Sequence, residues 1–241
     1  MSDIPRNQQI ELFDMSEPPR VEKIEKMRTE RTAVTLSRWI AGRTPGLTSV
    51  IDVGCGDGVA RHQLDAQTSY RGIDVGADIY ARSSDPSVIY IEDASSLADE
   101  LRRQQPAHTL FMFDVLEHTD TFVELFDIGS ELAQHQIVVS LPNEANLRHA
   151  IHMLLDELPG AHGVRMVGSK PGHRHKWLIN LSGAVDVLSS HANERGFALD
   201  RIVHVLNMAP GAGKRVARRL LMSALPLRLQ SYQFVLLFVR R

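Results

Sequence analysis

The nine residues from Val50 to Gly58, VIDVGCGDG, constrain the fold of this chain more than any other stretch. Three glycines stand at every second position directly behind an apolar, β-branched run. A strand that turns tightly into a helix needs glycine where φ is positive and where a Cβ would block a ligand. The start of the following helix adds backbone N–H groups and a positive dipole end. The stretch therefore predicts a strand–turn–helix unit that receives a polar or anionic group of a nucleotide-like cofactor.

Strands and helices are expected to alternate along most of the chain. The apolar patterns predict strands at 49–53, 70–74, 88–92, 109–114, 136–141, 198–206 and 233–239, and helices at 59–67, 96–103, 121–133 and 181–195. Such alternation implies right-handed crossovers and a doubly wound, mostly parallel sheet of the α/β class. Ligands of such sheets bind beyond the carboxyl ends of the strands.

The chain of 241 residues is long enough for one large α/β domain with additional segments. Residues 1–45 are expected to form an arm and a covering helix, because apolar residues with helical spacing begin at Val21. Residues 46–241 then form the main domain. Within it, 144–180 is expected to be a substrate-side insert, with an amphipathic helix at 146–158 and a glycine-rich stretch after it.

The composition of the chain excludes some classes of binding partner and cellular location. A hydrophobic content of 43%, a charged content of 23% and a net charge of -2 provide no global field that would attract nucleic acid. A single cysteine excludes an internal disulfide, the sequence after Met1 does not resemble a secretory signal, and no run reaches the roughly 18 apolar residues of a membrane span. We expect a cytoplasmic protein without a nucleic-acid partner.

The spacing of the glycines separates two kinds of cofactor. The dinucleotide fingerprint G-x-G-x-x-G, counted from Gly54, requires glycine at position 59, where this chain has valine; its third glycine is Gly58. Asp52 precedes the first glycine by two positions, where it would repel a pyrophosphate and suit an ammonium group. A cofactor with an ammonium therefore fits better, and an NAD-type oxidoreductase remains an alternative.

Five segments in order resemble the motifs of class I S-adenosylmethionine-dependent methyltransferases. They are DVGCGDG at 52–58, GIDV at 72–75, IEDA at 91–94, FDVLEH at 113–118 and VVSLPN at 138–143. The resemblance implies a seven-stranded, mostly parallel Rossmann-like sheet whose last strand, near 233–239, is inserted antiparallel. It implies S-adenosylmethionine as cofactor and S-adenosylhomocysteine as product.

The resemblance also assigns cofactor-binding residues. At the methionine end and near the reacting sulfonium it places Asp52, Gly54, Cys55, Gly56, Asp114 and Val115, with no chemistry assigned to the thiol of Cys55.

The adenosine end is assigned to four residues. Asp74 would accept hydrogen bonds from both ribose hydroxyls, or be a helix cap or surface carboxylate. Val75 would pack on the adenine face, or belong to the core. Asp93 with Ala94 would meet the adenine edge; alternatively, Asp93 caps the helix that begins near Ser95.

Two residues are candidates for catalysis. Asp114 begins the loop after the fourth strand of the motif series, and His118 ends a Leu-Glu-His tripeptide resembling that of small-molecule methyltransferases. Imidazole titrates near neutral pH, so His118 is the candidate general base; alternatively, it caps a helix. Asn143, His173 and His175 are expected to contact substrate. No metal is expected: His149, His152 and Asp156 share one helical face, but such a face is usually solvated.

The segment after the fifth motif, LPNEANLR at 141–148, resembles a methyltransferase group that includes methionine-biosynthesis W proteins and enzymes found with surface-polysaccharide pathways. The expected reaction is methyl transfer to oxygen, or secondarily nitrogen, of a small molecule or saccharide. The basic, apolar segment 211–229 could contact the inner face of a membrane, as suits a lipid-linked saccharide, or cover the sheet with its arginines in solvent. A non-catalytic partner protein that binds the cofactor is the second alternative.

Overall fold

The computed structural model describes residues 18–27, 29–75, 83–155, 162, 174–207 and 224–241. Eight strands form one sheet in the order β1-β7-β8-β6-β5-β2-β3-β4. Their bounds are β1 (Arg20–Lys26), β2 (Ser49–Val53), β3 (Ser69–Asp74), β4 (Val88–Tyr90), β5 (Ala107–Phe113), β6 (Ala133–Pro142), β7 (Phe197–Asn207) and β8 (Gln233–Arg240). The helices are α1 (Thr32–Ala41), α2 (Leu97–Arg102), α3 (Phe122–Leu132), α4 (Leu147–Leu154), α5 (Leu181–Glu194) and α7 (Leu227–Gln230).

The doubly wound, mostly parallel sheet predicted from the sequence is confirmed. Strands β2, β3, β4, β5 and β6 are parallel to their neighbours in that series. Strand β8 lies between β6 and β7 and is antiparallel to both, as expected of the last strand. The sheet has one strand more than expected, because β1 adds a parallel edge beside β7.

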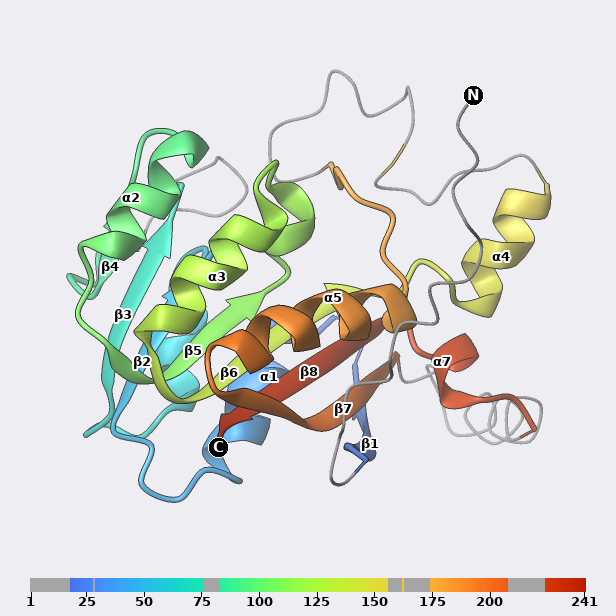
Figure 1. Cartoon of the computed structure of the whole chain (residues 1–241), viewed down its shortest axis with the longest axis horizontal. Coiled ribbons are helices and arrows are strands. Elements are labelled where there is room, and N and C mark those ends of the chain that lie inside the picture. Colours follow the sequence, from blue (N-terminus) through green and yellow to red (C-terminus); the bar gives the residue numbers. More distant parts are fainter. Residues whose placement is uncertain (1–17, 28, 76–82, 156–161, 163–173, 208–223) are drawn as a thin grey trace.

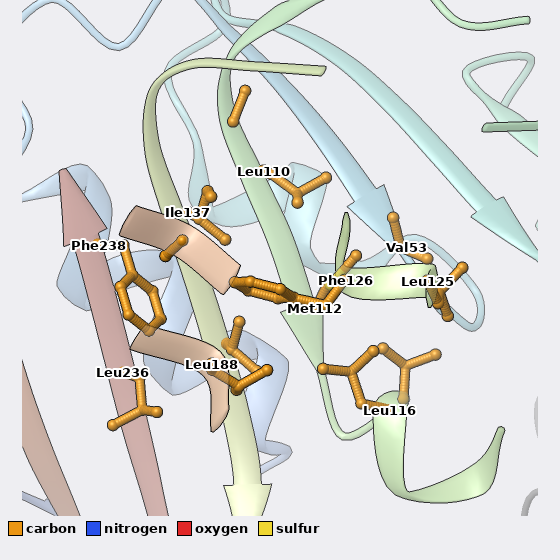
Figure 2. Packing of buried hydrophobic residues seen from close by; sticks show 14 of the residues in the cluster. Val53, Leu110, Met112, Leu116, Leu125, Phe126, Ile137, Leu188, Leu236 and Phe238 are labelled. Atoms are coloured by element: carbon orange, nitrogen blue, oxygen red, sulfur yellow. The ribbon is translucent and has the colours of Figure 1, made fainter. Parts of the chain in front are cut away.

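Helices cover both faces of the sheet. Helices α2, α3 and α5 lie on one face, while α1 lies behind the sheet in the same view (Figure 1). A hydrophobic core lies between the strands and helices α2, α3 and α5. In it, the rings of Phe126 of α3 and Phe238 of β8 are 5.9 Å apart between centroids (Figure 2). On the other face, Leu36 and Ile40 of α1 pack with Phe111 of β5.

The expectation of one helix beginning at Val21 is wrong. Residues Arg20–Lys26 form β1, and α1 begins only at Thr32. The apolar residues that suggested a helix, Val21, Ile24 and Met27, are three positions apart, but Val21 and Met27 are exposed. The side chains of β1 that turn inward are instead at alternate positions and are mostly charged. Helix α1 packs on a face of the sheet, where a position at its edge was expected.

Other elements differ in length from the predictions. The helix expected at 59–67 is the short 3-10 helix η1 (Val59–Gln63), and two further 3-10 turns are η2 (Ala94–Ser96) and η3 (Leu116–His118). The helix expected at 146–158 is α4, which ends at Leu154. Leu154 and the residue after the helix, Leu155, are both exposed. Most of 211–229 and His173 lie outside the described residues. No helix among the described residues is long and apolar enough to cross a membrane.

Candidate functional site

The glycine turn after β2 has the backbone geometry that its sequence predicts. Gly54, Gly56 and Gly58 all have positive φ, of 70°, 61° and 76°. A Cβ on Gly54 would lie 2.6 Å from Cγ2 of Val115, and one on Gly58 would lie 2.7 Å from Cγ2 of Val88. Both glycines are therefore required by backbone conformation and by close packing. The backbone N–H groups of the three glycines already donate within the protein, to the carbonyl oxygens of Ile73 and Cys55 and to the carboxylate of Asp74, so the turn contributes close access to its backbone.

Asp74 joins the end of β3 to the glycine turn. Its Oδ2 accepts a hydrogen bond from the backbone N–H of Gly56 at 2.7 Å, and the hydroxyl of Tyr90 donates to the carbonyl oxygen of Gly56 at 3.1 Å. Both polar groups of this glycine are thus fixed by the ends of neighbouring strands. The structure places Asp74 at the carboxyl edge of the sheet, as predicted, and Val75 follows it, partly exposed.

Asp93 forms the cap that was its alternative interpretation. Its side chain accepts hydrogen bonds from the backbone N–H of Ser95 at 3.1 Å and from the Ser95 hydroxyl at 2.9 Å. These bonds lower the pKa of Asp93. Asp93 and Ala94 are exposed and follow β4, and the backbone N–H of Ile91 donates to the carbonyl of Asp74 at 2.9 Å. The predicted adenosine-binding residues therefore lie along one edge of the sheet.

Asp52 is buried beneath the glycine turn. It is 2% exposed, and its Oδ2 accepts a hydrogen bond from the Tyr70 hydroxyl at 2.6 Å. Burial raises the pKa of Asp52 to about 7, against the lowering effect of the Tyr70 hydrogen bond. Burial, with the nearby carboxylates of Asp52 and Asp74, also raises the pKa of the Cys55 thiol. The thiol is therefore unreactive, in keeping with the lack of chemistry assigned to it.

A cavity of about 270 Å³ opens at the glycine turn. Its lining joins the start of α1 to the ends of β2 and β5 and comprises Glu30, Arg31, Thr32, Ala33, Asp52, Gly54, Cys55, Gly56, Phe113 and Asp114. Five of these residues were predicted to bind cofactor. The wall formed by Glu30 to Ala33 was missed, because these residues were expected to lie within one long helix. Arg31 holds this wall in place through two hydrogen bonds to Asp57, at 2.6 and 2.8 Å.

Asp114 is held in a strained conformation at the end of β5. It is the one non-glycine residue with positive φ among those described, at 55°. Its Oδ1 accepts from the Ser140 hydroxyl at 2.8 Å and from the side-chain amide of Gln233. Burial raises the pKa of Asp114, against the lowering effect of these hydrogen bonds. Ser140 and Gln233 were missed, because both are distant in sequence from Asp114. Ser140 stands in the fifth motif, but the resemblance assigns it no role, and Gln233 belongs to no motif.

The structure brings His118 and His175 together, as their shared assignment to the acceptor side requires. Their ring centroids are 4.9 Å apart. His118 Nδ1 lies 3.0 Å from the carbonyl oxygen of Arg174, and the backbone N–H of Lys176 donates to the carbonyl of Glu117 at 2.8 Å. The segment before α5 is thus attached to η3, and His118 is bonded to backbone across the site.

Asn143 has a structural environment. It is 2% exposed, and its Nδ2 donates to the carbonyl oxygens of Arg228 at 2.6 Å and Ser231 at 2.9 Å. The amide therefore fastens the end of β6 to the segment before β8. This geometry does not favour the substrate contact expected of Asn143.

Sequence reasoning missed Glu144, the residue after Asn143. Its Oε1 contacts Nδ1 of His175 at 2.7 Å and also Nε2 of His162, while Oε2 accepts from the backbone N–H of Ile179 at 2.8 Å. Burial acts to raise the pKa of Glu144, but the hydrogen bonds to His175 and His162 hold it below its usual value. Glu144 stands in the LPNEANLR segment, but the resemblance assigns it no role; its position there, two residues after the end of β6, was the available signal.

The fold is similar to that of known methyltransferases, although no protein-family model and no curated protein matches the sequence. A structure of a SAM-dependent methyltransferase from Archaeoglobus fulgidus has a TM-score of 0.53 at 17% identity, covering 86% of this chain and 92% of that chain. Magnesium protoporphyrin IX methyltransferase (ChlM) from Synechocystis PCC 6803, with bound SAH, has a TM-score of 0.52 at 16% identity, covering 87% and 82%.

A third similar structure is the plantazolicin methyltransferase BamL in complex with a triazolic desmethylPZN analog and SAH, with a TM-score of 0.54 at 11% identity, covering 86% of this chain and 82% of that chain. At these identities the similarity concerns the fold. The chain has the class I methyltransferase Rossmann-like fold, with β1 as an additional edge strand.

Proposed function

We propose that this chain is an S-adenosylmethionine-dependent methyltransferase acting on oxygen, or secondarily nitrogen, of a small molecule or saccharide. One observation carries the proposal: two left-handed glycines, Gly54 and Gly56, line one cavity together with the buried carboxyl group of Asp52, and Asp74 accepts a hydrogen bond from the backbone N–H of Gly56. The similar structures with bound SAH support the same cofactor for this fold. S-adenosylhomocysteine would be the product.

The residues at the cavity fit such a cofactor. The turn from Gly54 to Gly56 presents backbone without side chains, and Asp52 provides the negative charge that an amino-acid ammonium requires. Asp74 lies where a ribose would place its two hydroxyls, and Asp93 and Ala94 follow along the edge for the adenine. When bound, this cofactor supplies an electrophilic methyl group on sulfur.

The acceptor would approach over the ends of β5 and β6. Catalysis by this chain then consists first of alignment, because in-line displacement requires the acceptor atom and the sulfur on opposite sides of the methyl carbon. Asp114 forms part of the cavity wall, and His118 and His175 lie on the acceptor side. The expected contact of His173 lies outside the described residues.

An acceptor hydroxyl must also lose its proton. His118 Nδ1 faces a carbonyl oxygen, which can only accept a hydrogen bond, so Nδ1 carries the hydrogen and the lone pair is on Nε2. This lone pair can accept the hydroxyl proton directly, as the general-base hypothesis states. The same lone pair can instead bind an ion that acidifies the hydroxyl.

The cofactor assignment is tested by calorimetric titration with S-adenosylhomocysteine and, separately, NAD. We expect the wild type to bind only the former. Asp74→Ala should weaken binding by about 10- to 100-fold, which corresponds to about 1.5–3 kcal/mol for hydrogen bonds to a charged group. Asp74→Asn retains an acceptor for the N–H of Gly56 and therefore separates lost ribose contacts from a loosened turn.

The control for this titration is Asp99→Ala. Asp99 is an exposed carboxylate of α2 that pairs with Arg102 at 2.9 Å, away from the cavity, so its removal should leave binding unchanged. A folded wild type that binds NAD, or that does not bind S-adenosylhomocysteine, would contradict the proposal. Binding without methyl transfer to sugar, lipid-linked or quinone-like acceptors would favour the non-catalytic alternative.

A further inference from the structure

Histidine and glutamate side chains from three parts of the chain meet at the acceptor side of the site. Glu117 and His118 belong to η3 after β5, Glu144 follows β6, and His162 and His175 come from the segment between α4 and α5. Two groups of three side chains each have one potential ligand atom per residue within 4.8 Å of the others. The first group is Glu117, His118 and His175, and the second is Glu144, His162 and His175. The two groups share His175.

The hydrogen bonds of both central histidines orient their lone pairs. His118 Nδ1 bonds to the carbonyl of Arg174, and His175 Nδ1 bonds to the carboxylate of Glu144. Each ring therefore carries its hydrogen on Nδ1 and its lone pair on Nε2. A backbone carbonyl or a carboxylate behind the ring is the usual partner that fixes the tautomer and orientation of a metal-binding histidine.

Glu117 provides an independent observation. Its side chain is 1% exposed, and Oε2 has no hydrogen-bond partner in the described part of the chain. Oε1 lies 4.0 Å from Nε2 of His118. Burying a carboxylate without a partner costs several kcal/mol, so such a group normally binds a proton or a cation.

The surroundings of Glu117 favour a cation. The carboxyl groups of Asp114 and Glu144 lie near enough to Glu117 to act on it electrostatically. Three buried or half-buried carboxyl groups thus lie close together, and no arginine or lysine pairs with Glu117 or Glu144 among the described ion pairs. A divalent ion would compensate this charge directly.

We infer that Glu117, His118 and His175 form a binding site for one divalent transition-metal ion, with Glu144 orienting His175. Two imidazoles and one carboxylate suit zinc, manganese or iron(II) better than magnesium or calcium, which prefer all-oxygen ligands. Ligand atoms around an ion at about 2.1 Å lie about 3 to 3.5 Å apart, so the three side chains would draw together on binding. Three protein ligands leave coordination positions open.

The open positions give the ion a function that rests on the proposed methyl transfer. A hydroxyl oxygen bound to the ion becomes more acidic, because the ion stabilises the alkoxide. The hydroxyl proton would then leave to water, and the oxygen would attack the methyl carbon with its electron pair while the carbon–sulfur bond breaks and its electrons remain on the sulfur of S-adenosylhomocysteine. Since the lone pair on Nε2 of His118 binds the ion, His118 is a ligand in this mechanism and not the general base.

Metal binding is tested on the full-length protein after treatment with EDTA and dialysis. Zinc or manganese chloride is titrated by calorimetry, and bound metal is counted by elemental analysis. We expect one ion per chain in the wild type and loss of that ion in Glu117→Gln, His118→Gln and His175→Gln. Glu144→Gln should weaken binding about 10- to 100-fold without abolishing it, as expected of a residue that orients a ligand.

Two matched controls remove the same side-chain types elsewhere. His191 of α5 contacts Asp127 of α3 at 3.0 Å, and Glu124 of α3 pairs with Arg102 of α2 at 3.2 Å. His191→Gln and Glu124→Gln should bind metal as the wild type does. If the wild type binds neither metal, or if the three ligand variants bind as tightly as the controls, the site assignment is wrong.

Two further measurements keep the test decisive. Cobalt(II) added to the wild type should give a visible absorption band that EDTA removes, and this measurement needs no variant; a wild type without the band and without counted metal would overturn the site. S-adenosylhomocysteine binding is measured on every variant. If the protein binds metal but not S-adenosylhomocysteine, the metal-site assignment stands and the proposed function is wrong. If it binds S-adenosylhomocysteine but not metal, only the metal-site assignment is wrong.

Discussion

At the scale of single residues, the site depends on side chains that would be costly elsewhere in the protein. Asp52 is a buried carboxyl beside Asp74, with Tyr70 as hydrogen-bond donor and Arg31 as the cation that acts on it. Its pKa of about 7 in the folded state lies above the value of about 3.9 in an unfolded chain. The unfolded chain therefore releases this proton first as pH rises, and stability falls between these two pH values.

Asp52→Asn should remove this pH-dependent cost. The variant retains an acceptor for the Tyr70 hydroxyl. In urea denaturation at about pH 8 we therefore expect its free energy of unfolding to exceed that of the wild type by roughly 2–4 kcal/mol. At about pH 4 the difference should be small, because the wild-type carboxyl is then protonated in the folded state and still about half protonated in the unfolded chain. An equal difference at both pH values would contradict the assigned pKa. The variant should also bind S-adenosylhomocysteine more weakly.

Gly54 tests the close approach of the turn to η3. Gly54→Ala places a Cβ 2.6 Å from Val115 and also forces alanine to φ of 70°. We expect a loss of roughly 2–4 kcal/mol in the free energy of unfolding, combining backbone strain and overpacking. Gly46→Ala is the control, since Gly46 has φ of 75° with nothing within 4 Å of its Cβ position. Equal losses in both variants would show that Val115 does not contribute.

At the scale of elements, α1 closes the cavity because Arg31 ties its start to the glycine turn. The guanidinium makes two hydrogen bonds to Asp57, and both side chains are 32% exposed. In a double-mutant cycle with Arg31→Ala and Asp57→Ala we expect a coupling energy of about 1 kcal/mol in stability.

The comparison pair for this cycle is Arg103 and Glu100, a surface pair at 3.2 Å one turn apart on α2. Its coupling should be about 0.3–0.5 kcal/mol. If the Arg31 pair couples no more strongly than the surface pair, the start of α1 is held by packing alone.

Strand β1 explains why its region could not be predicted. Its inward side chains include Glu22 and Lys26, and charged residues at these positions conceal the two-residue period of a strand. Their partners lie outside the segment: Glu22 pairs with Arg201 of β7 at 2.5 Å, and Lys26 donates to the carbonyl oxygen of Glu30 at 2.5 Å. Local periodicity cannot report contacts with a strand about 180 residues away.

At the scale of the whole molecule, the parallel sheet and the backbone geometry of the glycine turn could be predicted because both depend on local patterns. The glycine turn, Asp74 and the strand order follow from short segments. The acceptor side could not, because its contacts connect distant segments: Gln233 reaches Asp114 across 119 positions, and His175 reaches Glu144 across 31. Spacing along the chain carries no information on such pairs.

The strand order predicts how amide protection is distributed. Strands β6 and β8 lie inside the sheet with a neighbour on each side, whereas β1 and β4 are its edges. Hydrogen exchange followed by mass spectrometry should show the slowest exchange in β6 and β8, and faster exchange in β1 and β4, because edge strands open locally at lower free energy. Exchange in β1 as slow as in β8 would indicate that an additional contact covers this edge.

The position of β8 has a consequence for folding during synthesis. This strand, the last of the eight in sequence, separates β6 from β7. In a nascent chain that has left the ribosome as far as β7, the edges of β6 and β7 that will face β8 have no partner strand. If these two edges paired with each other, they would exclude β8 from its place. The same strand carries Gln233, which bonds to Asp114. Completion of the sheet and completion of the site are thus one event, which requires that β8 has been synthesised.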